Sequence, residues 1–112
     1  MRVVNRDKFL ELPSGTVYRK LAENDDALYV KGDTINNGEK NIDWFYVSFN
    51  EVESEGSNEH FDRIHRMQEH GAQYPLGVTV SRDGLYEKGD MFYVLDGQDV
   101  MNIIDILSDT LD

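Results

Sequence analysis

The sequence predicts one α+β domain over residues 1–112, with an antiparallel sheet of about five strands, a short N-terminal helix, a middle helix and a C-terminal amphipathic helix. Short runs rich in β-branched and aromatic residues are separated by turn signals, as in an antiparallel sheet. Two other segments repeat their apolar residues with the period of a helix. The order of helix, three strands, helix, further strands and final helix favours helices that cover one face of the sheet.

The first helix is expected over residues 6–11. The Asn5 side chain can accept a hydrogen bond from the free amides of the first turn, which makes it a favourable N-cap. The helix has to end near Leu12, because Pro13 disfavours helical geometry in the residue before it. A Ser-Gly pair then favours a turn into the sheet.

Three strands are expected next, at residues 16–21, 27–31 and 42–52. A polar loop at 23–26 joins the first two strands. An Asn-Asn-Gly sequence that begins at Asn36 is a strong turn signal before the third.

The strand at 42–52 has the strongest signal, because it is rich in aromatic and β-branched residues. Successive side chains of a strand point to opposite faces. One face therefore carries Phe45, Val47 and Phe49, and the other carries Trp44 and Tyr46. Such a strand is either central or covered on one face by a helix or a second subunit. Without a helix over Trp44 and Tyr46, this apolar face predicts a homo-oligomer.

A second helix is expected up to His70, with Ser57 or Asn58 as its N-cap and Gly71 as its stop. At about 100° per residue, its apolar side consists of Phe61, Ile64, Gln68 and Ala72, with Met67 at the edge. The opposite side carries Arg63, Arg66 and His70.

Further strands are expected at residues 78–80, 85–86 and 91–95. A turn at 82–84 separates the first two. The final helix has Asp96 as its N-cap, reinforced by Asp99. Its apolar residues follow the spacing of a core-facing stripe and are Val100, Ile103, Ile104, Leu107 and Leu111.

The net charge is −11, and the acidic residues lie in two bands. Residues 32–62 hold eight acids and one lysine, and residues 89–112 hold six acids and no basic residue. Such bands repel nucleic-acid phosphates and anionic lipids, so we expect no direct DNA binding and no membrane binding. They either keep a small domain soluble or attract a basic protein surface. The acids expected to meet such a surface are Glu51, Glu53, Glu55, Glu59, Asp105 and Asp109.

The composition and the motifs argue against several kinds of chemistry. Without cysteine there is no disulfide, thiolate nucleophile or zinc finger. His60, His65 and His70 recur every five residues, so on a helix they point in three directions and do not converge on one metal. Neither a serine-nucleophile elbow nor a phosphate-binding loop is present. We therefore expect a protein that is not an enzyme and that uses no metal or cofactor.

One group of residues has a chemical interpretation as a ligand site: Arg63, Arg66, His70, Tyr74 and Arg82. Arginine makes bidentate contacts to phosphate, and an aromatic ring can stack on a base, so the group predicts a nucleotide pocket. The simpler interpretation is a solvated helix face on which Asp62 and Arg66 form an i,i+4 ion pair.

Five segments of the chain resemble small acidic proteins of tailed bacteriophages and prophages: residues 9–18, 30–35, 43–46, 60–63 and 82–86. The resemblance covers most of the chain and transfers no catalytic residue. It implies an accessory protein that counteracts host enzymes or host immunity by binding them.

Three functions follow from these observations. The first is a non-catalytic anti-defence protein that docks an acidic surface onto a host defence protein. The alternative is an oligomeric sponge that sequesters a nucleotide immune signal. The third is a small metal-dependent hydrolase, for which no carboxylate pair stands out. The start lacks a signal-peptide pattern and no window of 18 apolar residues occurs, so we expect the host cytoplasm as the location.

Overall fold

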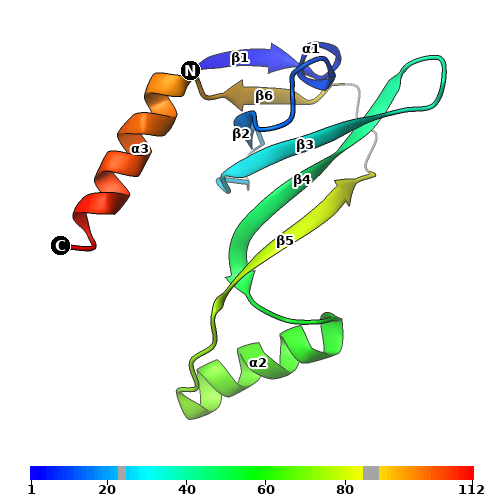
Figure 1. Ribbon diagram of the computed structural model, residues 1–112. Coiled ribbons are helices and arrows are strands. Elements are labelled where there is room, and N and C mark those ends of the chain that lie inside the picture. Colours follow the sequence, from blue (N-terminus) through cyan, green and yellow to red (C-terminus); the bar gives the residue numbers. More distant parts are fainter. Residues whose placement is uncertain (23–24, 85–88) are drawn as a thin grey trace.

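The chain folds into an α+β structure with one six-stranded antiparallel sheet, seen in a computed structural model that describes residues 1–22, 25–84 and 89–112. The strand order is β1-β6-β2-β3-β4-β5. The elements are β1 (Arg2–Asn5), α1 (Arg6–Leu10), β2 (Val17–Lys20), β3 (Tyr29–Asn36), β4 (Asn41–Val52), α2 (Ser57–His70), β5 (Leu76–Asp83), β6 (Met91–Val94) and α3 (Gly97–Asp109). Figure 1 shows α1 beside β1 and β6, α2 beyond the far end of β4 and β5, and α3 projecting from the sheet.

The N-terminal predictions are confirmed. The Asn5 side chain accepts a hydrogen bond from the Lys8 amide at 2.9 Å and caps α1. The Asn-Asn-Gly turn joins β3 to β4, with Gly38 at a φ of 97°, a conformation that glycine adopts without a steric cost. β1 is an additional strand that the sequence patterns did not indicate, and it pairs with β6.

The predicted turn at 82–84 is wrong, because Arg82 and Asp83 continue β5 and pair with Phe45 and Trp44 of β4. The predicted strand at 85–86 lies outside the described residues, as do positions 23–24 of the predicted polar loop. The strand expected at 78–80 is therefore longer at both ends, and it forms one edge of the sheet.

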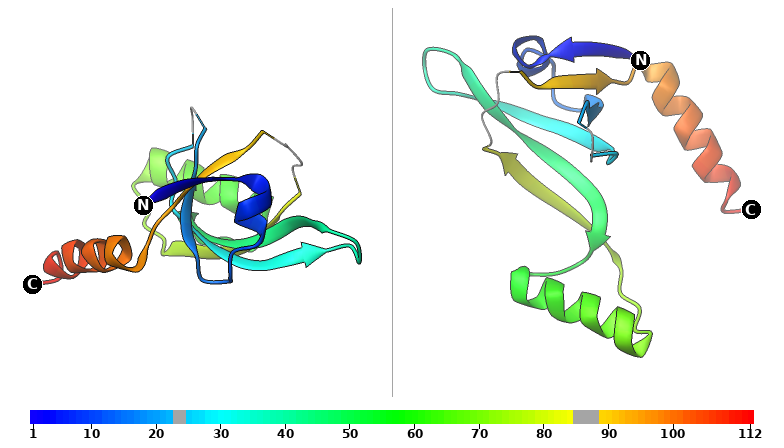
Figure 2. Two further views of the ribbon diagram at one scale, coloured as in Figure 1. Left: turned by 90° about the horizontal axis from the view of Figure 1, so that it is seen from above. Right: turned by 180° about the vertical axis from the view of Figure 1, so that it is seen from behind.

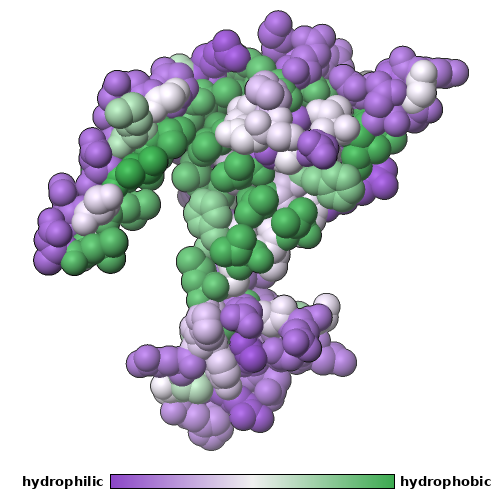
Figure 3. Space-filling view, viewed as in Figure 1, coloured by the Kyte–Doolittle hydropathy of each residue, from purple (hydrophilic) through white to green (hydrophobic). Residues whose placement is uncertain are grey.

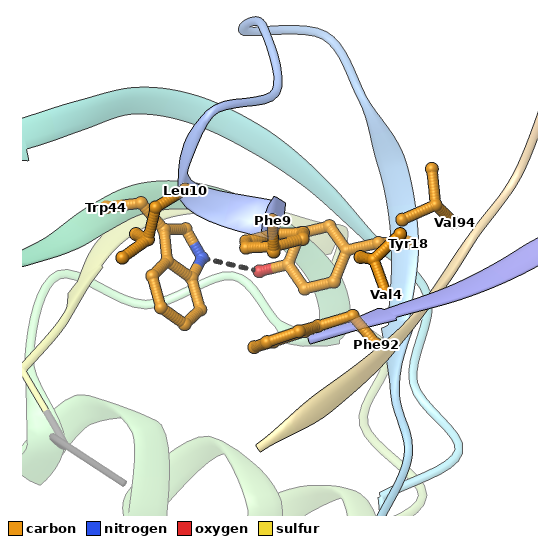
Figure 4. Close-up of a cluster of buried hydrophobic side chains, with 7 residues drawn as sticks. All are labelled: Val4, Phe9, Leu10, Tyr18, Trp44, Phe92 and Val94. Atoms are coloured by element: carbon orange, nitrogen blue, oxygen red, sulfur yellow. Dashed lines mark hydrogen bonds between the residues drawn. The ribbon is translucent and has the colours of Figure 1, made fainter. Parts of the chain in front are cut away.

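The core is an aromatic cluster at the α1 end of the sheet (Figure 4). Its buried residues are Val4, Phe9, Leu10, Tyr18, Trp44, Phe92 and Val94. The Phe9 and Phe92 rings are stacked with centroids 4.1 Å apart. The Trp44 indole Nε1 donates to the Tyr18 hydroxyl at 2.9 Å, so the polar atoms of this core are satisfied.

Of the two alternatives for the face with Trp44 and Tyr46, a helix or a second subunit, the structure shows the helix. Trp44 is fully buried against Phe9 and Phe92, and Tyr46 packs against the same cluster. Phe45, on the opposite face of β4, is 40% exposed. Alternation along the strand assigned these residues to the correct faces, and α1 with its neighbours covers the face of Trp44 and Tyr46.

Helix α2 stops as expected, at Gly71 in the left-handed conformation. Its N-cap is Gly56, which makes no side-chain hydrogen bond, so the prediction of Ser57 or Asn58 as the cap is wrong. No residue of α2 is buried, and Phe61 is 68% exposed. The apolar side of α2 is thus largely uncovered.

Helix α3 begins at a complete capping box. The Asp96 carboxylate accepts from the Asp99 amide at 2.9 Å, and the Asp99 carboxylate accepts from the Asp96 amide at 3.0 Å. The prediction that its apolar stripe faces the core is wrong, because no residue of α3 is buried. In Figures 1 and 2 the helix projects away from the sheet. Among the described residues, none of the helices is long and apolar enough to cross a lipid bilayer.

Candidate functional site

Three of the five residues predicted for a ligand pocket lie together at the C-terminal end of α2. Arg66, His70 and Tyr74 line an open hollow of about 510 Å³, together with Asp62, His65 and Ala72. The His65 and His70 rings lie 6.2 Å apart, centroid to centroid. The five-residue spacing did not indicate this proximity, because it turns two residues about 140° apart around a helix. His70 is the last residue of α2.

The other two predicted residues have different surroundings. Arg63 lies over the Tyr74 ring, with its guanidinium carbon 4.6 Å from the centroid, and it donates to the Glu53 carbonyl at 2.8 Å. Arg82 is on β5, where its Nε donates to the Asp43 carboxylate at 2.9 Å. The structure therefore brings Arg63 to the edge of the hollow and leaves Arg82 apart from it.

Acidic neighbours neutralise the arginines of α2. Arg63 forms an i,i+4 ion pair with Glu59 at 2.9 Å, and Arg66 forms one with Asp62 at 3.0 Å. The second of these is the pair that the simpler interpretation of the sequence expected. Because each guanidinium already has a carboxylate, an anionic ligand would have to compete with it.

The glutamates predicted to contact a partner surround the junction of β4 and α2. Glu51, Glu53 and Glu55 are exposed, and the carboxylate of Glu51 lies 3.8 Å from His60. Glu59 belongs to the ion pair with Arg63. The two predicted aspartates, Asp105 and Asp109, are exposed on α3. In Figures 1 and 2 α2 and α3 lie apart, so the acids form two separate patches instead of one surface.

The apolar stripe of α3 is the feature that the sequence interpretation placed incorrectly. Ile104, Leu107 and Leu111 are 54%, 60% and 86% exposed. Figure 3 shows hydrophobic surface along the side of α3 that faces the sheet, with open space between the helix and the sheet. Burying one Leu or Ile stabilises a protein by about 1.5–3 kcal/mol. Covering the stripe would therefore be favourable by several kcal/mol. This is a large part of the free energy of unfolding of a typical domain, which is about 5–15 kcal/mol.

The acids of α3 lie on the side opposite its stripe. At about 100° per residue, Asp105 and Asp109 lie on one side of the helix and Leu107 lies on the other, while Leu111 and Asp112 follow after the end of α3. None of these three aspartates forms an ion pair with a described residue. Helix α3 thus has an apolar side, half-buried only at Val100 and Ile103, and an anionic side that forms no ion pair with a described residue.

Lys31 of β3 is the one buried lysine among the described residues, being 2% exposed. Its ammonium donates to the Thr34 hydroxyl at 2.6 Å and to the Gly32 carbonyl at 3.1 Å. Burial lowers the pKa of Lys31, while the charge of Asp33 opposes that shift. Because the ammonium is enclosed by the sheet and already bonded, its role is structural.

Within the described residues, no group of three or more His, Asp and Glu side chains could hold a metal ion.

Neither a family model, nor a curated protein, nor a solved structure matches this chain. The resemblance to phage proteins is not tested by these comparisons and stays a prediction. A proposal for the function therefore depends on the geometry of the described residues.

Proposed function

We propose that the protein is a non-catalytic binding protein that docks α3 into an apolar groove of a basic host protein. The observation that carries the proposal is the apolar stripe of α3, a capped helix in which Ile104 and Leu107 are more than half exposed; the exposed Leu111 follows in the turn after the helix. An amphipathic helix laid into a groove is a recurrent mode of protein recognition, anchored by residues at this spacing.

The length of α3 supports a bound role. Isolated helices shorter than about 12–15 residues are marginal in water, and α3 has 13 residues. Its capping box satisfies amides at the N-terminus, but its apolar side is exposed to solvent. A partner that covers the stripe would remove the apolar surface from water and stabilise the helix at the same time.

The charge of the protein supports a basic target. With the stripe in a groove, Asp105 and Asp109 would point away from its floor, so they would act mainly through their long-range field. Opposite potentials speed association, whereas buried apolar contacts set the rate of dissociation. The exposed glutamates near the start of α2 add to the same field. In this proposal the acids accelerate encounter and the stripe holds the complex together.

The identity of the target follows from the resemblance to phage proteins, which favours a host defence protein such as a nuclease with a cationic surface. A photo-crosslinking amino acid at position 107 should capture such a protein from host cells. The same amino acid at position 3, an exposed residue of β1, is the matched control. Capture from both positions, or from position 3 alone, would contradict docking through α3.

Kinetics with the captured protein test the division of roles. Leu107→Ala should raise the dissociation rate by about fivefold or more, because truncation of an anchor residue costs more than about 1 kcal/mol. Asp105→Asn combined with Asp109→Asn should lower the association rate and its salt dependence, with little change in dissociation. A complex whose dissociation is unchanged by Leu107→Ala would refute the proposal.

The hollow at the end of α2 favours a second candidate, the sequestration of a nucleotide signal. Arg66, His70 and Tyr74 line it together, which provides a cation and an aromatic ring for a phosphate and a base. Calorimetry with cyclic oligonucleotides tests this function. Stoichiometric binding that is lost in Arg66→Ala would support it, and an absence of heat would exclude it for those ligands.

A further inference from the structure

The edge strand β5 is a second uncovered surface, independent of α3. It is the last strand of the sheet order, and Figure 1 shows no described element along its outer edge. An edge strand presents unpaired backbone amides and carbonyls, and natural proteins usually protect it with charges, prolines or a short length. β5 has eight residues, and its side chains on one face are strongly exposed: Leu76 at 64%, Val78 at 72% and Val80 at 69%.

The absence of charge distinguishes this edge from the rest of the molecule. No charged residue occurs from Gly71 to Ser81, in a chain of which 29% of the residues are charged. In a symmetric dimer every side chain at the interface meets its own copy or a neighbour of it, so an acidic surface would repel itself. For a protein with a net charge of −11, an uncharged edge is the surface suited to a second copy.

The order of side chains also suits self-pairing. A two-fold axis requires two β5 strands to pair antiparallel. With the axis at Val78, this residue faces Val78 of the second copy, and Leu76 faces Val80 of the second copy. Residues 76–80 are then paired without a charge, and exposed apolar side chains lie opposite one another, as in stable cross-strand pairs.

We propose that two copies of this chain form a dimer by antiparallel pairing of their β5 edges about Val78, which joins the two sheets into one. The apolar face would then continue across the axis, because Phe45 and Val47 of β4 lie opposite Arg82 and Val80 of β5. The other edge strand, β1, is a poorer candidate, since it has four residues and begins with the charged Arg2. The proposal does not depend on the function proposed for α3.

The first test is the oligomeric state of the intact chain and of matched variants. Sedimentation from about 1 µM to about 1 mM covers the range in which an interface of this modest size assembles. The wild type should shift from monomer to dimer, and Val78→Lys should remain monomeric. Val3→Lys on β1 and Leu107→Lys on α3 should dimerise as the wild type does. The near-ultraviolet spectrum of Trp44 reports whether each variant is folded.

The second test fixes the register. The chain has no cysteine, so Val78→Cys introduces a single thiol. Residues directly opposite in an antiparallel pair have Cα atoms about 4.5–5.5 Å apart, within the range of a disulfide. Mild oxidation should therefore crosslink Val78→Cys completely, and Val3→Cys should stay uncrosslinked. A monomeric wild type, or a dimer that Val78→Lys leaves intact and Leu107→Lys disrupts, would overturn the proposal.

Discussion

Helix α3 and the β5 edge both expose large apolar side chains, but their charges differ. Leu107 on α3 and Val78 on β5 are 60% and 72% exposed. The side of α3 opposite its stripe carries two aspartates, Asp105 and Asp109, whereas the residues from Gly71 to Ser81 carry no charge at all. Large exposed apolar patches are typical of surfaces that bind another protein. We propose that the charge around each surface selects its partner: a basic foreign protein for α3, and a second copy of this chain for β5.

The largest expected effect is a difference in the free energy of unfolding between a variant of the covered core and a variant of an exposed surface. Phe92→Ala should lower the free energy of unfolding by about 3–5 kcal/mol, because it removes a ring from a packed cluster. Leu107→Ala should change it by no more than about 0.5 kcal/mol, because nothing covers that side chain. Urea unfolding followed by Trp44 fluorescence measures both values. A loss of several kcal/mol in Leu107→Ala would mean that α3 packs against the domain in solution.

A smaller effect should be confined to β5. An added methyl group at Gly77 would lie 3.0 Å from the Glu53 Cα atom, which belongs to the backbone and cannot move aside easily. Gly77→Ala should therefore cost about 1–3 kcal/mol by overpacking. Hydrogen exchange should become faster in β5 and remain unchanged in α3. Gly84→Ala is the matched control, because a methyl group there meets no atom within 4 Å; an equal loss in this control would contradict the explanation.

The next effect should be confined to α3. Asp96→Ala removes the side-chain half of the capping box and should destabilise the helix by about 1 kcal/mol. Far-ultraviolet circular dichroism should report less helix, and the affinity for the target should fall. Dimerisation through β5 should stay unchanged, since α3 takes no part in it. A variant that loses the dimer as well would show that the two surfaces are coupled.

The smallest expected effect is on the pH dependence of the free energy of unfolding, through Tyr29 of β3. Burial, together with the hydrogen bond from the Tyr29 hydroxyl to Asp25, raises the pKa of Tyr29 from 10 to about 12. The folded state therefore holds this proton more tightly, so the stabilisation is complete below pH 10 and is lost as the pH rises towards 12. Tyr29→Phe should show a shallower loss of stability over that interval. Urea unfolding at pH 10 and pH 12 measures the free energy of unfolding of both proteins. An equal loss of this free energy in the wild type and in Tyr29→Phe would contradict the assignment.

Local signals predicted much of the secondary structure correctly. The Asn5 cap of α1, the turn after Asn36, the stop of α2 at Gly71 and the capping box of α3 are all present. Each depends on residues that are close in sequence, which is why the sequence alone could predict it. The candidate ligand residues were found only in part, because Arg82 binds Asp43 from another strand and His65 approaches His70 at a helix end.

Neighbouring residues in the sequence set where the apolar faces and the charges of this protein lie. Periodicity placed Leu107 on one side of a helix and Trp44 on one face of a strand, and both assignments hold. Which of these faces is covered depends on contacts between distant segments: Phe9 and Phe92 bury Trp44, while nothing described buries Leu107. The reason is physical. A face is set by the geometry of neighbouring residues, whereas its burial depends on segments far away in the chain.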